Sequence, residues 1–153
     1  MFALFRTDDS WSLLIARVAL GMVMLAHGAQ KLLGWFGGNG FSGTMAFFTS
    51  QGMPAALAFL VIVSESFGSL GLIVGLLTRV AAFGTAFVML GAIGMVHWQN
   101  GFFMNWFGKQ AGEGFEYHLL ALGLALGLLI GGGGKASVDR AIAEQLAQAD
   151  RSR

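Results

Sequence analysis

The sequence predicts an all-α membrane protein: a four-transmembrane-helix bundle with a short interfacial helix in the first outer loop and a C-terminal amphipathic helix. Hydrophobic residues make up 56% of the 153 residues and charged residues only 11%, whereas soluble domains average about 25% charged residues. Four apolar segments approach or exceed the length of about 20 residues that a helix needs to cross the hydrocarbon core. The 24 glycines suit packed membrane helices, because glycine lets two backbones approach closely.

The four apolar segments are expected to cross the membrane in turn, although the fourth is barely long enough. We expect the first to be retained, because two aspartates precede it and because it is too long for a signal peptide and lacks a small-residue cleavage site. In chain order the segments are Ser12–Leu33, Pro54–Leu76, Arg79–His97 and Phe115–Gly131.

The connections between these segments differ in length. The turn Leu77-Thr78 joins the second segment to the third. The first outer loop, Gly34–Met53, contains the apolar stretch Phe41–Ser50, which predicts a short helix at the membrane interface. The other long loop, Asn100–Gly114, carries aromatic residues that favour the headgroup level: Phe102, Phe103, Trp106 and Phe107.

The chain ends in a segment of different character. Gly131–Gly134 stops the fourth helix, and Ser137 can cap a final amphipathic helix that runs to about Gln148. Residues 1–136 are therefore expected to form the transmembrane domain, and residues 137–153 a cytoplasmic amphipathic helix with a polar tail.

The distribution of basic residues predicts the orientation, because cytoplasmic loops are enriched in lysine and arginine. Lys31 and Lys109 fall on one side of the predicted bundle, and six basic residues fall on the other. We therefore expect both termini in the cytoplasm. The six are Arg6, Arg79, Lys135, Arg140, Arg151 and Arg153.

Glu65 is the most informative residue, because it is the only charge in the apolar run Pro54–Leu76. At 1.5 Å per residue it lies roughly 16 Å below the outer end of its helix. A charge near the bilayer midplane costs roughly 3 kcal/mol on insertion scales. Such a residue is expected to have a partner or a task.

Other polar residues are expected to converge on Glu65 from the outer side. All three histidines, His27, His97 and His118, fall in the outer half of the predicted bundle, and Glu116 opens the fourth helix. Polar and small residues share helix faces, which should point into the bundle. These faces are Arg17, Gly21, Met24, Gly28 and Lys31 in the first helix, Ser64, Gly68, Gly71 and Gly75 in the second, and Gly123, Gly127 and Gly131 in the fourth.

A carboxylate beside histidines suggests a proton relay, which a quinone site needs when the ring is reduced or oxidised. The three histidines and two glutamates could instead ligate a metal ion, although no HExxH-like pattern or i, i+4 histidine pair occurs. A structural alternative is that Glu65 simply pairs with Arg17 or Lys31. Lys31 could also extend to the outer interface.

Several classes are excluded by composition. The chain has no cysteine, which excludes disulfides, thiolate catalysis and cysteine-ligated iron–sulfur or zinc sites. It has no basic stripe, so nucleic-acid binding has no support.

The order and spacing of several short motifs resemble the DoxX family of small bacterial inner-membrane proteins. The resemblance covers nearly the whole chain. In chain order the motifs are Arg17-x3-Gly21-x5-His27-Gly28-x2-Lys31, Gly40-Phe41, Gly52-x-Pro54, Glu65, Gly75-Leu76-Leu77-Thr78-Arg79, His97, Gly101-Phe102-Phe103, Glu116-Tyr117 and Gly134-Lys135-Ala136-Ser137-Val138-Asp139.

The resemblance implies a four-helix protein of the bacterial inner membrane linked to redox metabolism. Some members are subunits of thiosulfate:quinone oxidoreductase, and others associate with redox-defence enzymes. It implies functional positions at Arg17, His27, Lys31, Glu65, His97 and Glu116, with His118 a less regular part of the pattern. Any redox centre would be a quinone, a histidine-ligated metal or haem, or the cofactor of a partner.

The leading hypothesis is a quinone-linked oxidoreductase subunit with a polar, outward-facing pocket. Glu65 and His27 would exchange protons there, while Lys31, Arg17, His97, Glu116 and His118 would bind the ligand or tune its charge. The alternatives are a non-catalytic anchor or scaffold for redox-defence enzymes, and transport of a small solute or proton by an oligomer. Expected partners are the lipid bilayer and a second redox subunit or further copies of the chain.

Overall fold

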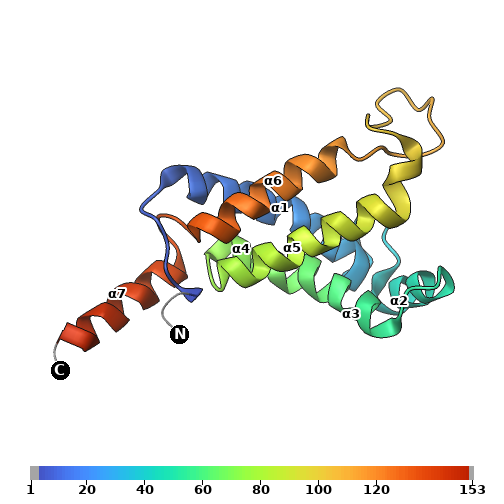
Figure 1. Cartoon of the computed structure of the whole chain (residues 1–153). Coiled ribbons are helices and arrows are strands. Elements are labelled where there is room, and N and C mark those ends of the chain that lie inside the picture. Colours follow the sequence, from blue (N-terminus) through green and yellow to red (C-terminus); the bar gives the residue numbers. More distant parts are fainter. Residues whose placement is uncertain (1–3, 152–153) are drawn as a thin grey trace.

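Most of the chain is helical (Figure 1). A computed structural model describes residues 4–151, and these residues contain no strand. The elements are α1 (Trp11–Leu33), η2 (Trp35–Gly37), α2 (Gly40–Ser50), α3 (Ala55–Val63), η3 (Ser64–Gly68), α4 (Ser69–Val74), α5 (Thr78–Ala92), η4 (Ile93–His97), η5 (Trp98–Asn100), α6 (Glu116–Gly131) and α7 (Val138–Arg151).

Three stretches are long and apolar enough to cross a membrane. They are α1 with 23 residues, the continuous helix Ala55–Val74 with 20, and the continuous helix Thr78–Asn100 with 23. α6 is also apolar but has 16 residues, or about 24 Å at 1.5 Å per residue, which is less than the hydrocarbon thickness of about 30 Å. The predicted membrane character is confirmed, whereas the predicted number of four spans is not.

The bundle buries small and branched apolar side chains and exposes large ones. α1 packs against α4, and α5 packs along α6. The core between them includes Leu20, Met24, Leu72, Ala82, Ala86, Ala125 and Leu128. Large apolar side chains on the outer faces remain exposed, including Ile15, Phe59, Phe67, Phe83, Phe87 and Ile130. Such an exposed apolar belt is expected of helices whose solvent is lipid.

The predicted small-residue faces are partly right. Gly21 and Gly28 of α1 are buried, and a Cβ on Gly28 would lie 2.4 Å from the backbone oxygen of Glu65. In contrast, Gly123 and Gly127 of α6 are exposed, and no described atom lies within 4 Å of the place that a Cβ would occupy on either residue. The prediction for α6 was wrong at these two positions, because the helix turns Ala121, Ala125 and Leu128 into the core instead. It was right for Gly131, which is buried against Leu13.

The two long helices after α2 each contain a turn of π-helix. One is η3, within the helix that carries Glu65, and the other is η4, which ends at His97. A π-helical turn admits an extra residue, shifts the side chains that follow it, and is frequent at functional sites. After each π-helical turn, the side chains therefore lie on helix faces that the spacing of a regular α-helix does not predict.

The two ends of the bundle differ. The start of the described chain and α7 lie at one end, and α2 and the loop 101–115 lie at the other (Figure 1). We call these the α7 end and the α2 end. At the α7 end Ser137 caps α7 as predicted, since its Oγ accepts a hydrogen bond from Arg140 N at 3.2 Å. α7 runs to Arg151, beyond the predicted end, and Arg153 lies outside the described residues.

Candidate functional site

The α2 end of the bundle contains a cavity of about 380 Å³. Five of the seven predicted site residues line it: His27, Lys31, Glu65, His97 and His118. They come from α1, the helix Ala55–Val74, the helix Thr78–Asn100 and α6. The other lining residues are Met24, Phe48, Met89, Ala92, Met104, Glu113 and Tyr117. The cavity thus combines ionisable groups with a largely apolar wall, which is typical of small-molecule sites.

Glu65 is paired with Lys31 inside this cavity. Lys31 Nζ lies 2.5 Å from Glu65 Oε2, and the side chains are 22% and 6% exposed. The lysine is Glu65's only ion-pair partner among the described residues. The alternative in which Lys31 extends to the interface was therefore wrong. A nearby cation stabilises a buried carboxylate, and the Lys31 side chain accordingly points inward to Glu65.

Gly28 makes this pairing possible. Because Gly28 has no side chain, α1 approaches the backbone of Glu65 and Ser66 closely. Ser66 Oγ donates a hydrogen bond to the Gly28 carbonyl at 3.3 Å, which ties α1 to η3. Lys31 follows Gly28 by three residues and so lies on the same helix face, one turn closer to the α2 end.

Aromatic rings form a continuous row along the cavity. The ring centroids of His27 and Tyr117 are 6.1 Å apart, those of Tyr117 and His118 are 5.2 Å apart, and those of His118 and His97 are 4.0 Å apart. His97 Nδ1 lies 2.8 Å from the carbonyl oxygen of Glu113. Because a carbonyl only accepts, this contact requires a proton on Nδ1, and Nε2 is then the acceptor of the neutral ring. His118 Nδ1 is buried without a hydrogen-bond partner among the described residues.

Tyr117 also lines the cavity, although it was not among the residues predicted for the site. Among residues 4–151 its hydroxyl donates only to the Met24 sulfur, at 3.8 Å, and a thioether is a weak acceptor. The signal that could have identified it was its position in the motif Glu116-Tyr117, one residue before His118. Of the three methionines in the wall, Met24 was predicted to lie on an inward-pointing helix face. Met89, in an apolar helix, and Met104, in a loop, had no distinguishing signal.

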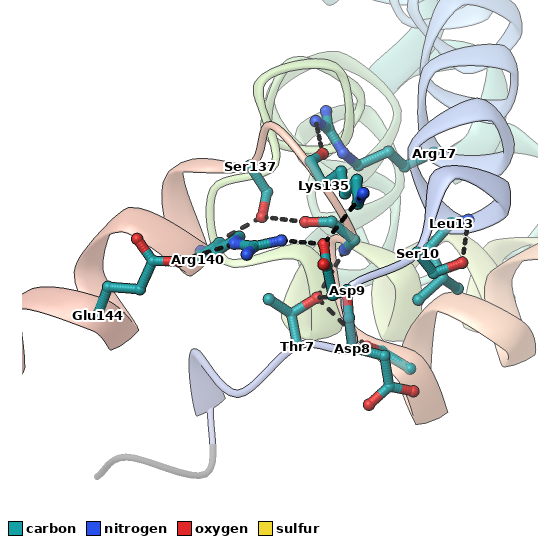
Figure 2. Close-up of polar contacts among 12 residues, drawn as sticks. Thr7, Asp8, Asp9, Ser10, Leu13, Arg17, Lys135, Ser137, Arg140 and Glu144 are labelled. Carbon is teal, nitrogen blue, oxygen red and sulfur yellow. Dashed lines mark hydrogen bonds and ion pairs between the residues drawn. The ribbon is translucent and has the colours of Figure 1, made fainter. Parts of the chain in front are cut away.

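Arg17 does not line the cavity and does not pair with Glu65. It is 1% exposed and lies at the α7 end (Figure 2). Its guanidinium donates to the carbonyls of Gly133 at 2.8 Å, Leu72 at 3.1 Å and Ala136 at 2.6 Å, and also to those of Ile73 and Lys135. The expected charge-tuning role near Glu65 was wrong, because the open carbonyls of a helix end attract the five donors of arginine.

Glu116 also lies outside the cavity lining. Its Oε1 accepts hydrogen bonds from the backbone N–H of Met104 at 2.9 Å and from Trp106 Nε1 at 3.1 Å. The carboxylate therefore shapes the loop 101–115, which closes the α2 end beside the cavity. Met104 and Glu113 bring this loop into the cavity wall.

The metal alternative finds no support in residues 4–151. Among these residues no group of three or more His, Asp or Glu side chains is placed to hold a metal ion. The three histidines His27, His97 and His118 line one cavity, and the rings of His97 and His118 pack against each other at an angle of 38°.

These features define a class: a small helical membrane protein whose spans enclose a cavity with a buried ion pair and three histidines. The DoxX family model matches residues 12–98. A protein of Bacillus subtilis (strain 168) named "Putative oxidoreductase CatD" is 30% identical over 115 residues, which cover 75% of this chain and 76% of that protein. This chain belongs to the DoxX family. No solved structure gives a significant match.

The family match is shorter than the resemblance carried by the motifs. It includes Arg17, His27, Lys31, Glu65 and His97 and stops before α6. Eight of the twelve residues that line the cavity, including His27, Lys31, Glu65 and His97, lie within the match, and four lie beyond it: Met104, Glu113, Tyr117 and His118.

Proposed function

We propose that this protein is the membrane subunit of a quinone-linked oxidoreductase and that the 380 Å³ cavity binds the quinone ring. The observation that carries the proposal is the composition of the cavity. Methionine and aromatic side chains provide an apolar slot for a flat ring, and ionisable side chains from several helices provide polar contacts for its oxygens.

A quinone takes up two electrons and two protons when it is reduced, and it releases them when it is oxidised. In the proposed site Glu65 and His27 exchange these protons. Lys31 stabilises negative charge, and it holds Glu65 in place through the 2.5 Å contact. His97 offers Nε2 as an acceptor, since Nδ1 is engaged by the Glu113 carbonyl. Tyr117 offers a hydroxyl that has only a weak acceptor in the protein.

The proposed topology has four spans and cytoplasmic termini in the bacterial inner membrane, with α6 as a short fourth span. The packing of α6 along the length of α5 supports it. So does the grouping of basic residues at the α7 end. There Arg79 donates to the carbonyls of Arg6 and Leu129, and Arg140 pairs with Asp9 (Figure 2). Cytoplasmic segments favour such basic residues.

Electrons would reach or leave the cavity through a second redox subunit that carries its own cofactor. The chain has no cysteine to hold an iron–sulfur cluster. The similarity to a protein named as an oxidoreductase supports a redox role for the complex. It does not identify the second substrate.

The test is quinone binding to the purified protein in lipid nanodiscs. A short-chain quinone should quench tryptophan fluorescence in a saturable way, and Glu65→Gln together with Tyr117→Phe should weaken binding at least tenfold. Phe83→Leu, an exposed position on the outer face of α5, is the matched control and should bind as the unchanged protein does. Absence of saturable binding, or equal affinity in the site variants, would refute the proposal.

The anchor or scaffold alternative is favoured by one observation, the ordered aromatic loop. Phe103, Trp106 and Phe107 are 65%, 78% and 86% exposed, and Glu116 holds the loop that presents them. If this loop docks a redox enzyme, Trp106→Ala should abolish co-purification of that enzyme while quinone binding is unchanged. Retention of the enzyme by the Trp106→Ala variant would exclude the loop as the docking surface.

A further inference from the structure

A second cavity lies on the other side of Lys31. It has a volume of about 220 Å³ and is lined by Gln30, Lys31, Gly38, Asn39, Thr44, Phe47 and Phe48. It shares only Lys31 and Phe48 with the main cavity. Lys31 therefore stands between two compartments, with Glu65 on one side and a cavity whose lining contains no acidic residue on the other.

The N-terminus of α2 opens into this second cavity. α2 has 11 residues, its N-cap is Asn39, and no side chain caps its first N–H groups. Gly38 and Asn39 line the cavity directly before the helix begins. Free N–H groups and the positive end of the helix dipole at such a terminus favour an anion.

Thr44 provides a second, independent sign of a ligand. It is only 4% exposed, it lines the cavity, and no hydrogen bond of its hydroxyl is formed with any described residue. Polar side chains at such buried positions nearly always have a partner in the protein, in water or in a ligand. The cavity is the place from which such a partner would come.

We propose that this cavity is a binding site for a phosphate-type oxyanion, held by the Lys31 ammonium, the N-terminus of α2 and the Thr44 hydroxyl. A tetrahedral oxyanion accepts from all three kinds of donor at once. Exposed aromatic side chains on the same segment, Trp35, Phe36 and Phe47, favour the headgroup level of a membrane. The oxyanion is accordingly either a lipid phosphate or a free phosphate ion.

The proposal has a specific consequence for the ion pair. Lys31 would share its charge between the bound oxyanion and Glu65, so the two anions compete for one cation. Removal of the Glu65 charge should therefore strengthen oxyanion binding. This consequence separates the oxyanion site from the proposed quinone site, at which the same substitution should weaken binding.

The experiment titrates inorganic phosphate into the protein by calorimetry, in nanodiscs of phosphatidylcholine at constant ionic strength. Thr44→Val should weaken binding about fivefold, the effect of one lost hydrogen bond. The double variant Lys31→Gln/Glu65→Gln, which leaves no unpaired charge, should weaken it at least tenfold. Glu65→Gln alone should tighten it several-fold. Thr49→Val is the control, because Thr49 is exposed on the same helix and donates to its own helix backbone at 2.9 Å.

Native mass spectrometry of protein purified from phosphatidylglycerol-containing membranes separates the two sources. Retention of phosphatidylglycerol that is lost in Thr44→Val assigns a lipid phosphate, and phosphate binding without retained lipid assigns a free ion. The proposal is overturned if neither binds, or if Thr44→Val and the double variant bind phosphate as well as Thr49→Val does.

Discussion

Replacement of Gly28 by alanine tests whether the close approach of two backbones builds the site. A Cβ at position 28 would lie 2.4 Å from the Glu65 carbonyl oxygen and 2.7 Å from Ser66 Cα. Both are backbone atoms, which cannot rotate away. Ordinary contact for a Cβ begins at 3.4 Å, so α1 must retreat from η3 by the difference, about 1.0 Å. Overpacking of this kind costs about 1–3 kcal/mol.

The same displacement carries Lys31 away from Glu65. A 1 Å shift would lengthen the 2.5 Å contact to about 3.5 Å and weaken the pairing of a buried charge. Gly28→Ala should therefore lower both the stability of the bundle and the affinity of the main cavity for a quinone. Unfolding by SDS in mixed micelles measures the first effect, and tryptophan quenching by a short-chain quinone measures the second.

Gly123→Ala is the matched control. Gly123 is also within a helix, it is exposed, and no described atom lies within 4 Å of its Cβ position. Alanine should stabilise that helix by up to about 1 kcal/mol through its higher helix propensity. If Gly28→Ala is as stable as Gly123→Ala and binds quinone equally well, the close approach of α1 to η3 does not determine the site.

Three further predictions concern the charged residues. Lys31→Met leaves the Glu65 carboxylate buried without a cation, so it should lower the free energy of SDS unfolding by about 3–5 kcal/mol. The double variant Lys31→Met/Glu65→Gln should recover most of that loss. Equal stability of the single and double variants would contradict the ion pair. Arg17→Met removes the donor to carbonyls of α4 and of the segment before α7 and should cost at least about 3 kcal/mol in the same assay, whereas a loss below about 1 kcal/mol would show that water satisfies them. Glu116→Ala removes the acceptor of Met104 N–H and Trp106 Nε1, so it should accelerate amide exchange in the loop 101–115 without slowing or accelerating exchange in α1; unchanged exchange in the loop would contradict this role.

The sequence predicted most elements because their signals are local. An apolar run such as Ser12–Leu33 specifies a helix through hydropathy alone, and Ser137 specifies the start of α7 through its capping hydroxyl. Of the seven polar residues predicted for the site, five line one cavity, because buried polar residues in a membrane helix face the interior. These inferences need no knowledge of which helix neighbours which.

The pairings could not be predicted in the same way, because each depends on helix rotation and on neighbours distant in sequence. Arg17 and Lys31 lie on one face of α1, and both were possible partners for Glu65. Arg17 instead donates to carbonyls at the end of α4, one of which belongs to Leu72, 55 residues away in sequence. Lys31 pairs with Glu65. Gly123 looked like an interior position by its spacing, but the rotation of α6 turns it outward.

The two ends of the bundle place their buried charges in different environments, and this contrast bears on function. At the α7 end Arg17 has five backbone acceptors, and Asp139 accepts from Leu77 N at 2.7 Å and Thr78 N at 2.8 Å. These charges are fully engaged with the backbone and hold the helix ends together.

At the α2 end Glu65 has one partner, Lys31, which also faces a second cavity. His118 Nδ1 has no hydrogen-bond partner among the described residues, and His97 keeps Nε2 available. A purely structural polar cluster is expected to satisfy its own groups, because an unpaired buried group is costly. The unpaired ring nitrogen of His118 lies in the wall of the main cavity, where a ligand can supply the missing partner. A thermal shift produced by quinone should accordingly vanish in Glu65→Gln/Tyr117→Phe, and one produced by phosphate should vanish in Lys31→Gln/Glu65→Gln. Both shifts should survive Asp139→Asn, which weakens only the α7 end.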